Sequence, residues 1–135
     1  MKFYRLLHVL AAAALSVLSL HAQNQQPPSP EEQEKQLMEY VDKEVQRLST
    51  LLKLEYWQEF YVDSTLTHDM HARLEELQQL QKAKVENVDL YQAVSDKWMQ
   101  QIDDSYKRFF TEEQWKKYWS NTGKKAQKER DKRKK

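Results

Sequence analysis

The scarcity of glycine limits what this chain can fold into more than any other feature of its sequence. Gly123 is the only glycine among 135 residues. Tight hairpins and phosphate-binding loops need a backbone with positive φ, which glycine adopts most easily. A Walker loop, a Rossmann fingerprint and a nucleophile elbow are therefore excluded. A sandwich or barrel rich in tight turns is disfavoured for the same reason.

The first 22 residues have the pattern of a secretory signal. Lys2 and Arg5 give a positive start, an apolar run covers residues 9–20, and Ala22 supplies a small residue at the expected cut before Gln23. The run is shorter than the roughly 20 residues of a membrane span, although an uncleaved anchor is the alternative. The chain has no Cys, which excludes disulfides and makes a lipid anchor after the cut implausible. Export without disulfides favours a bacterial periplasm.

Charge is distributed unevenly along the remaining chain, which is short enough for a single domain. Residues 23–122 carry 12 Lys and Arg against 19 Asp and Glu, a net charge of −7. Residues 123–135 carry eight against two, a net charge of +6. We therefore expect a signal peptide at 1–22, a flexible polar leader at 23–29, an acidic helical domain at 30–120 and a basic tail at 121–135.

Helix starts are marked three times by a capping residue followed, three positions later, by Glu or Gln. These pairs are Ser29 with Glu32, Asp89 with Gln92, and Thr111 with Gln114. Apolar residues then recur at intervals of three and four, which is the spacing of one helix face. Such stripes include Leu37, Val41, Val45, Leu48 and Leu52, and later Tyr91, Val94, Trp98 and Ile102.

The sequence therefore predicts an all-α protein with about four amphipathic helices, near 30–52, 56–85, 89–109 and 112–120. Short connections favour an antiparallel, extended or cradle-like arrangement. The junction at residues 53–55 lacks Gly and Pro, so the first two helices could be continuous. A domain this small buries only about 60–70% of its unfolded surface. Homodimerisation is a natural way to complete the core, although the sequence does not require it.

A weak metal-site pattern lies on the second predicted helix. His68, His71 and Glu75 recur at intervals of three and four, so they can share one face, and Zn²⁺ takes such ligands. The HExxH arrangement of zinc proteases is absent. The simpler interpretation is a solvated face with incidental His, and we expect no cofactor, with zinc as the alternative.

Nothing else in the sequence indicates catalysis. Adjacent acidic pairs, such as Asp103 with Asp104, point about 100° apart on a helix and do not face each other. No Ser-His-Asp arrangement is evident. We expect a protein that is not an enzyme.

Aromatic residues are the most distinctive feature of the helical domain, and they gather in two clusters. One contains Tyr56, Trp57, Phe60 and Tyr61, and the other contains Tyr106, Phe109, Phe110, Trp115, Tyr118 and Trp119. Packing between helices is the simpler explanation. The functional alternative is an exposed surface for a protein partner, for which the candidate residues are Trp57, Phe60, Trp115 and Trp119.

Basic residues interleave with the second cluster and continue into the tail. Aromatic and basic residues together suit an anionic membrane surface or single-stranded nucleic acid. An exported protein rarely meets nucleic acid, so no nucleic-acid partner is expected. The simpler interpretation is a basic tail that either is disordered and aids solubility or folds loosely on the acidic domain.

Two segments resemble the Leu-Thr-x-x-Gln motifs of the Spy/CpxP family of small periplasmic helical proteins. Residues 110–114, Phe-Thr-Glu-Glu-Gln, resemble the second motif, with Phe110 in place of Leu. Residues 54–58, Leu-Glu-Tyr-Trp-Gln, resemble the first, with Glu55 in place of Thr. The resemblance covers roughly residues 30–120.

The resemblance implies a cradle of antiparallel helices, usually dimeric, that acts without ATP as a chaperone or in the envelope stress response. Some relatives bind zinc, and clients lie on a concave surface with apolar and basic patches. We therefore expect an exported chaperone-like protein that holds partly unfolded clients. The alternative is a structural or regulatory protein that docks on one envelope protein or on an anionic membrane surface.

Overall fold

A computed structural model describes residues 28–134, all of whose regular elements are helical. The predicted signal at 1–22 and residues 23–27 of the predicted leader lie outside the described residues. The chain divides into two units between Gln33 and Glu34. In the order of the chain, the elements are α2 (Pro30–Leu52), α3 (Tyr56–Lys82), α4 (Val88–Phe109), α5 (Glu112–Tyr118), the π-helical turn η1 (Trp119–Gly123) and α6 (Lys124–Arg133). The predicted all-α class is confirmed.

Residues 28–33, the described part of the first unit, contain the start of α2. Ser29 and Glu32 form the capping box that the sequence predicts there. The Glu32 N–H donates to Ser29 Oγ over 3.2 Å, and the Ser29 N–H donates to a Glu32 carboxylate oxygen over 2.9 Å. Two backbone donors of the first turn are satisfied in this way.

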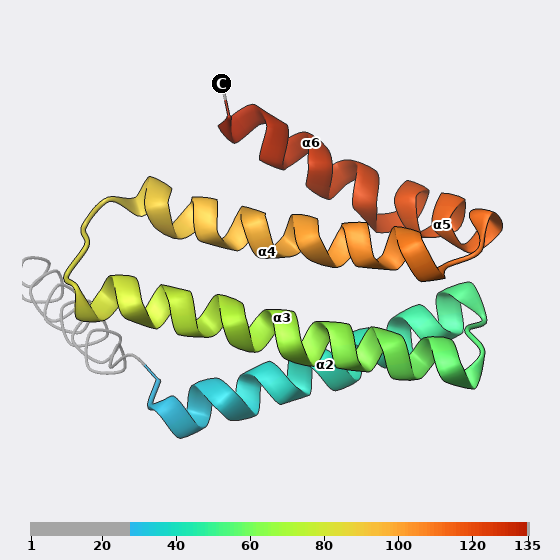
Figure 1. Cartoon of the computed structure of the whole chain (residues 1–135), viewed down its shortest axis with the longest axis horizontal. Coiled ribbons are helices and arrows are strands. Elements are labelled where there is room, and N and C mark those ends of the chain that lie inside the picture. The colour runs from blue at the N-terminus through green and yellow to red at the C-terminus, as the bar shows by residue number, and fades with distance from the viewer. Residues whose placement is uncertain (1–27, 135) are drawn as a thin grey trace, which may run out of the picture. The chain divides into compact units, whose positions relative to one another are not determined.

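Helices α3 and α4 are antiparallel neighbours within the unit that begins at Glu34 (Figure 1). The two turns that reverse the chain before them contain no glycine. Lys53 and Lys84 instead adopt positive φ values of 51° and 54°. A left-handed residue other than glycine costs about 1–2 kcal/mol, which helix packing on either side must offset. Helix α2 ends at Leu52, directly before Lys53, so the predicted break between the first two helices is confirmed and the alternative of one continuous helix is wrong.

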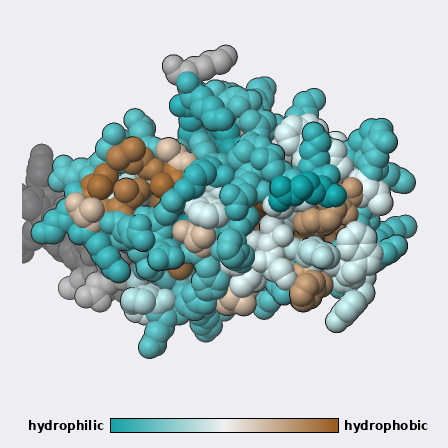
Figure 2. Space-filling view, in the orientation of Figure 1, coloured by the Kyte–Doolittle hydropathy of each residue, from teal (hydrophilic) through white to brown (hydrophobic). Residues whose placement is uncertain are grey.

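One apolar core joins α2, α3, α4 and α5. Its ten buried members are Val41, Leu48, Leu52, Val62, Leu66, Met70, Ile102, Tyr106, Phe110 and Tyr118. Val41, Leu48, Leu52 and Ile102 lie on the stripes named in the sequence. The visible surface is largely hydrophilic, with one apolar area over the start of α4 and another beside its last turns (Figure 2). None of the described helices is long and apolar enough to cross a membrane.

The start of α4 corrects one predicted cap. Asp89 was expected to cap this helix with Gln92, but Asn87 occupies the capping position. The Asn87 side chain accepts the Asp89 N–H over 3.0 Å, and the Gln92 amide donates instead to Asp96. Asn is as good a cap as Asp, and the helix gains two residues by starting earlier.

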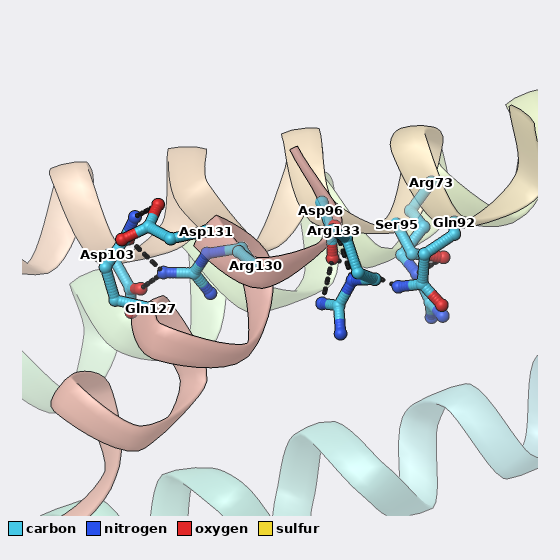
Figure 3. A network of polar contacts seen from close by, with 9 residues as sticks. All are labelled: Arg73, Gln92, Ser95, Asp96, Asp103, Gln127, Arg130, Asp131 and Arg133. Carbon is cyan, nitrogen blue, oxygen red and sulfur yellow. Dashed lines mark hydrogen bonds and ion pairs between the residues drawn. The ribbon is translucent and has the colours of Figure 1, made fainter. Parts of the chain in front are cut away.

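Of the two forms expected for the basic tail, the disordered one is wrong, because residues 124–133 form helix α6, which runs back along α4 (Figure 1). Arg130 donates to the carboxylate of Asp103, and the side chains of both are about 4% exposed. The Tyr118 hydroxyl donates to the same carboxylate over 2.5 Å. Arg133, the last residue of α6, donates twice to Asp96 at 2.6 and 2.9 Å (Figure 3). Two arginines of the tail are therefore used within the fold.

Replacing Arg130 by Ala is expected to lower the free energy of unfolding by about 3 kcal/mol, because it leaves the Asp103 carboxylate buried without its cation. Urea unfolding followed by circular dichroism measures the change. The matched control is Arg133→Ala, which breaks the more exposed pair with Asp96 and should change stability much less. Equal effects of the two substitutions would contradict this account of the α6 contact.

Candidate functional site

The first turn and a half of α3 displays a compact group of rings, which we call the aromatic cluster: Tyr56, Trp57, Phe60 and Tyr61. Their exposed fractions are 87, 47, 62 and 52%. Half of the large apolar side chains exposed by residues 28–134 belong to this one group. Trp57 and Phe60 each meet Tyr61 edge to face, with ring centroids 6.0 and 5.9 Å apart. The rings thus support each other while keeping apolar area in contact with water.

The aromatic cluster is continuous with the second predicted aromatic group. Tyr61 contacts Phe109 at 5.8 Å between ring centroids, and Phe109 contacts Tyr106 at 5.7 Å. Tyr106 in turn packs against Tyr118 at 5.4 Å. One seam of rings therefore runs from the start of α3, across the end of α4, to α5. Its interior is buried and its first end is exposed.

The four candidate binding residues separate along this seam. Trp57 and Phe60 lie at its exposed end. Trp115 and Trp119 lie at the other end, half-buried and stacked on each other with centroids 5.4 Å apart. Trp115 also packs against the core. Trp57 and Phe60 are therefore more accessible to solvent than Trp115 and Trp119.

Gly123 explains how Trp119 fits against the π-helical turn. This residue has an ordinary helical φ of −62°, so its backbone does not require glycine. A Cβ atom placed there would lie 2.4 Å from the ring atom Cε3 of Trp119. The glycine of this chain thus serves close side-chain packing, whereas lysines make the left-handed turns.

Two glutamines hold the starts of α3 and α5 together behind the aromatic cluster. Gln58 is 1% exposed, and its amide nitrogen donates to Gln114 Oε1 over 2.7 Å. The Gln114 amide donates back to Gln58 Oε1 over 3.0 Å. Each also donates across to the end of another helix, Gln58 to the carbonyl of Phe109 and Gln114 to that of Leu52. The pair therefore joins four helix ends.

The same glutamines complete capping boxes at their own helices. Gln114 accepts the Thr111 N–H over 3.0 Å, and Thr111 Oγ1 accepts the Gln114 N–H over 3.2 Å. At the other helix, Gln58 accepts the Glu55 N–H over 3.0 Å. The two segments that resemble Leu-Thr-x-x-Gln motifs, residues 54–58 and 110–114, thus meet through their last residues. Capping patterns in the sequence predict the box at Thr111, but they predict neither the box at Glu55 nor the contact between the two glutamines.

The predicted metal residues are not brought together. His68 Nδ1 contacts the carboxylate of the buried Asp69 at 2.8 Å, and His71 Nε2 contacts that of Glu34 at 3.2 Å. Within the described part of the chain, no group of three or more His, Cys, Asp or Glu side chains is placed to hold a metal ion. The geometry at His68, His71 and Glu75 therefore gives no support to a zinc site.

Two buried tyrosines dominate the electrostatics of the seam. Burial raises the pKa of Tyr118 well above the ordinary value, and the negative charge of Asp103 adds to this. Burial likewise raises the pKa of Tyr106 strongly. The Tyr106 hydroxyl has no hydrogen-bond partner within the described residues. These groups stay neutral in the folded protein, which suits a structural seam rather than proton transfer.

No family model, curated protein or solved structure matches the chain in comparisons with known proteins.

Truncation of Gln58 to Ala should lower the free energy of unfolding by about 1–3 kcal/mol, because Gln114 then lacks its buried partner. Truncation of Gln114 should do the same. The double variant should lose less than the sum of the two, with a coupling of about 1 kcal/mol in a double-mutant cycle measured by urea unfolding. Gln92→Ala, on the surface of α4, is the control. Additive losses at Gln58 and Gln114 would show that the two amides act independently.

Stability should fall as the pH rises above about 10, the ordinary pKa of tyrosine in the unfolded chain. The raised folded pKa values mean that Tyr106 and Tyr118 bind protons more tightly when folded, so their contribution is complete below pH 10 and is lost above it. Each contributes a slope of about 1.4 kcal/mol per pH unit. Thermal unfolding between pH 8 and 11 tests this: Tyr118→Phe should reduce the slope, whereas replacement of the exposed Tyr56 by Phe should not. Equal slopes for both variants and the parent would contradict it.

Proposed function

We propose that this protein is an exported, non-catalytic binding protein that holds apolar segments of partly unfolded proteins on its aromatic cluster. The observation that carries the proposal is the exposure of Tyr56, Trp57, Phe60 and Tyr61 on consecutive turns of one helix. Contiguous exposed apolar surface of this kind typically marks a place where a protein meets a partner. Tyr and Trp suit such a surface because each joins a large apolar body to a polar tip.

The residues beneath the aromatic cluster are fixed, which keeps its rings exposed and available for binding. Gln58 lies within the aromatic cluster's own sequence but is buried and fixed by Gln114. Tyr61 leans on Phe109, which belongs to another helix. The exposed rings therefore have few ways to bury themselves, so a client can cover them with little loss of conformational entropy in this protein.

Two parts of the proposal, export and a non-catalytic role, come from the sequence. Residues 1–22 have the pattern of a signal peptide, and a compartment without ATP requires weak, reversible holding. The resemblance of residues 54–58 and 110–114 to Spy/CpxP motifs is consistent with the same role. A second copy of the chain is a natural way to enlarge the binding surface.

A membrane role for the C-terminal segment has less support than protein binding. Helices that lie in a membrane surface insert an apolar face. Helix α6 contains only one apolar residue, Ala126, and two of its arginines are engaged with α4. Its exposed lysines can still attract an acidic client. We therefore expect α6 to contribute to client binding through electrostatic attraction that weakens as the salt concentration rises.

Truncation of Trp57 and Phe60 together to Ala should weaken suppression of the aggregation of a chemically denatured reporter protein. Light scattering at low and high salt measures the effect. Helix content should be unchanged by circular dichroism, because both rings are about half or more exposed. The matched control is Val88→Ala with Leu90→Ala, which removes exposed apolar area at the start of α4.

Three outcomes would count against the proposal. Suppression that survives loss of Trp57 and Phe60 but fails in the control would move the site to the start of α4. Lost helix content would show that the rings belong to the core. No suppression by the parent protein, together with saturable binding of one envelope protein, would favour a dedicated docking role instead.

A further inference from the structure

A small groove opens between α2 and α3, directly beside the aromatic cluster. Its volume is about 340 Å³. Tyr56 and Phe60 form part of its wall, together with Val45 and Gln46 of α2. The remaining lining residues are all acidic: Asp42, Glu59 and Asp63. The groove thus combines exposed rings with three carboxylates and contains no Lys or Arg.

Two of these carboxylates have no partner in the fold. The third carboxylate, that of Glu59, does have a partner, because it accepts a hydrogen bond from Ser49 Oγ. Asp42 and Asp63, by contrast, make no hydrogen bond or ion pair with any described residue. Asp96 and Asp103 on α4 differ from them, because each pairs with an arginine of α6. The groove therefore keeps negative charge in a place where the protein supplies no neutralising cation.

The geometry suits a long cationic side chain better than any other common group. The ring faces of Tyr56 and Phe60 attract cations through their π electrons and also cover aliphatic carbon. Lys and Arg have apolar stems that lie along such rings while the charged head reaches a carboxylate. An acidic side chain would meet repulsion from Asp42 and Asp63, and a purely apolar one would leave both charges unpaired.

We infer that this groove binds Lys or Arg side chains of a partner polypeptide that also carries a neighbouring apolar residue for the aromatic cluster. The inference rests on the proposed function and narrows it, since it names the segments preferred among unfolded clients: those in which a basic residue flanks an apolar one. Charge complementarity selects the class of ligand, and the exposed rings anchor it.

Helix α6 of a second copy is the other cationic occupant available, but it fits less well. Arg130 and Arg133 are already paired with α4 of their own chain. The remaining face of α6 offers lysines with Ala126 as the only apolar residue, which leaves Phe60 uncovered. A flexible partner segment can place a basic side chain in the groove and an apolar side chain on the aromatic cluster at the same time.

Binding of two fluorescent peptides to the full protein tests the inference by anisotropy. Both peptides carry the same Leu and Phe residues, and they differ only in having Lys or Glu between them. The Lys peptide should bind about tenfold more tightly at low salt. Asp42→Asn with Asp63→Asn should weaken the Lys peptide about three- to tenfold and leave the Glu peptide unchanged or tighter. Salt near 1 M, where the screening length is about 3 Å, should remove the difference.

The control variant is Glu86→Gln with Asp104→Asn, which changes the net charge equally at exposed positions outside the groove. An equal loss of Lys-peptide affinity in this control would show that net charge, not the groove, provides the preference, and would overturn the inference. The inference would also be overturned if Asp42→Asn with Asp63→Asn converted a dimer to a monomer without changing the affinity for either peptide. That result would assign the groove to contact with a second copy of the chain.

The failure of this inference is distinguishable from failure of the proposed function. If Tyr56→Ala with Phe60→Ala abolishes binding of both peptides while the Asp substitutions change nothing, the aromatic cluster binds clients without a preference for cations. If neither peptide binds and the parent protein suppresses no aggregation, both proposals are wrong.

Discussion

Placement of the aromatic cluster depends on the reciprocal hydrogen bonds between the amides of Gln58 and Gln114. An amide buried without a partner is costly, so these side chains must meet once the helices around them pack. Their meeting fixes the start of α3 against the start of α5 and against the last turns of α2 and α4. With Gln58 turned inward, the residues beside it on the helix, Trp57 and Phe60, turn outward. The same contact thus produces a closed core and an open aromatic surface.

A buried ion pair between α4 and α6 gives charge a structural role in this fold. Asp103 is buried, and it is stabilised by Arg130 from α6 and by the hydroxyl of Tyr118. A buried carboxylate requires such partners, so the strongly basic C-terminal segment becomes a packed helix and not a free tail. The molecule therefore has two surfaces of opposite charge: the exposed basic residues of α6, and the groove that contains Asp42 and Asp63.

Much of the helical architecture could be predicted from the sequence, because caps and apolar stripes are local signals. Thr111 and the positions along α2 illustrate this. Helix α6 was missed because it has no apolar stripe, and its stability comes from ion pairs with residues about 30 positions earlier. The left-handed turn at Lys53 was missed because the general preference for glycine at positive φ is weaker than tertiary packing. Exposure of Trp57 and partial burial of Trp115 could not be separated, since both occur at helix starts in similar aromatic surroundings.

Site-specific crosslinking tests the central claim most directly. A photoreactive phenylalanine derivative in place of Phe60 should crosslink efficiently to a denatured reporter protein, and the same group in place of Val88 should not. Crosslinked sites on the reporter should concentrate in apolar segments. Equal crosslinking from both positions, or crosslinking from the Val88 position alone, would contradict the assignment of client binding to the aromatic cluster.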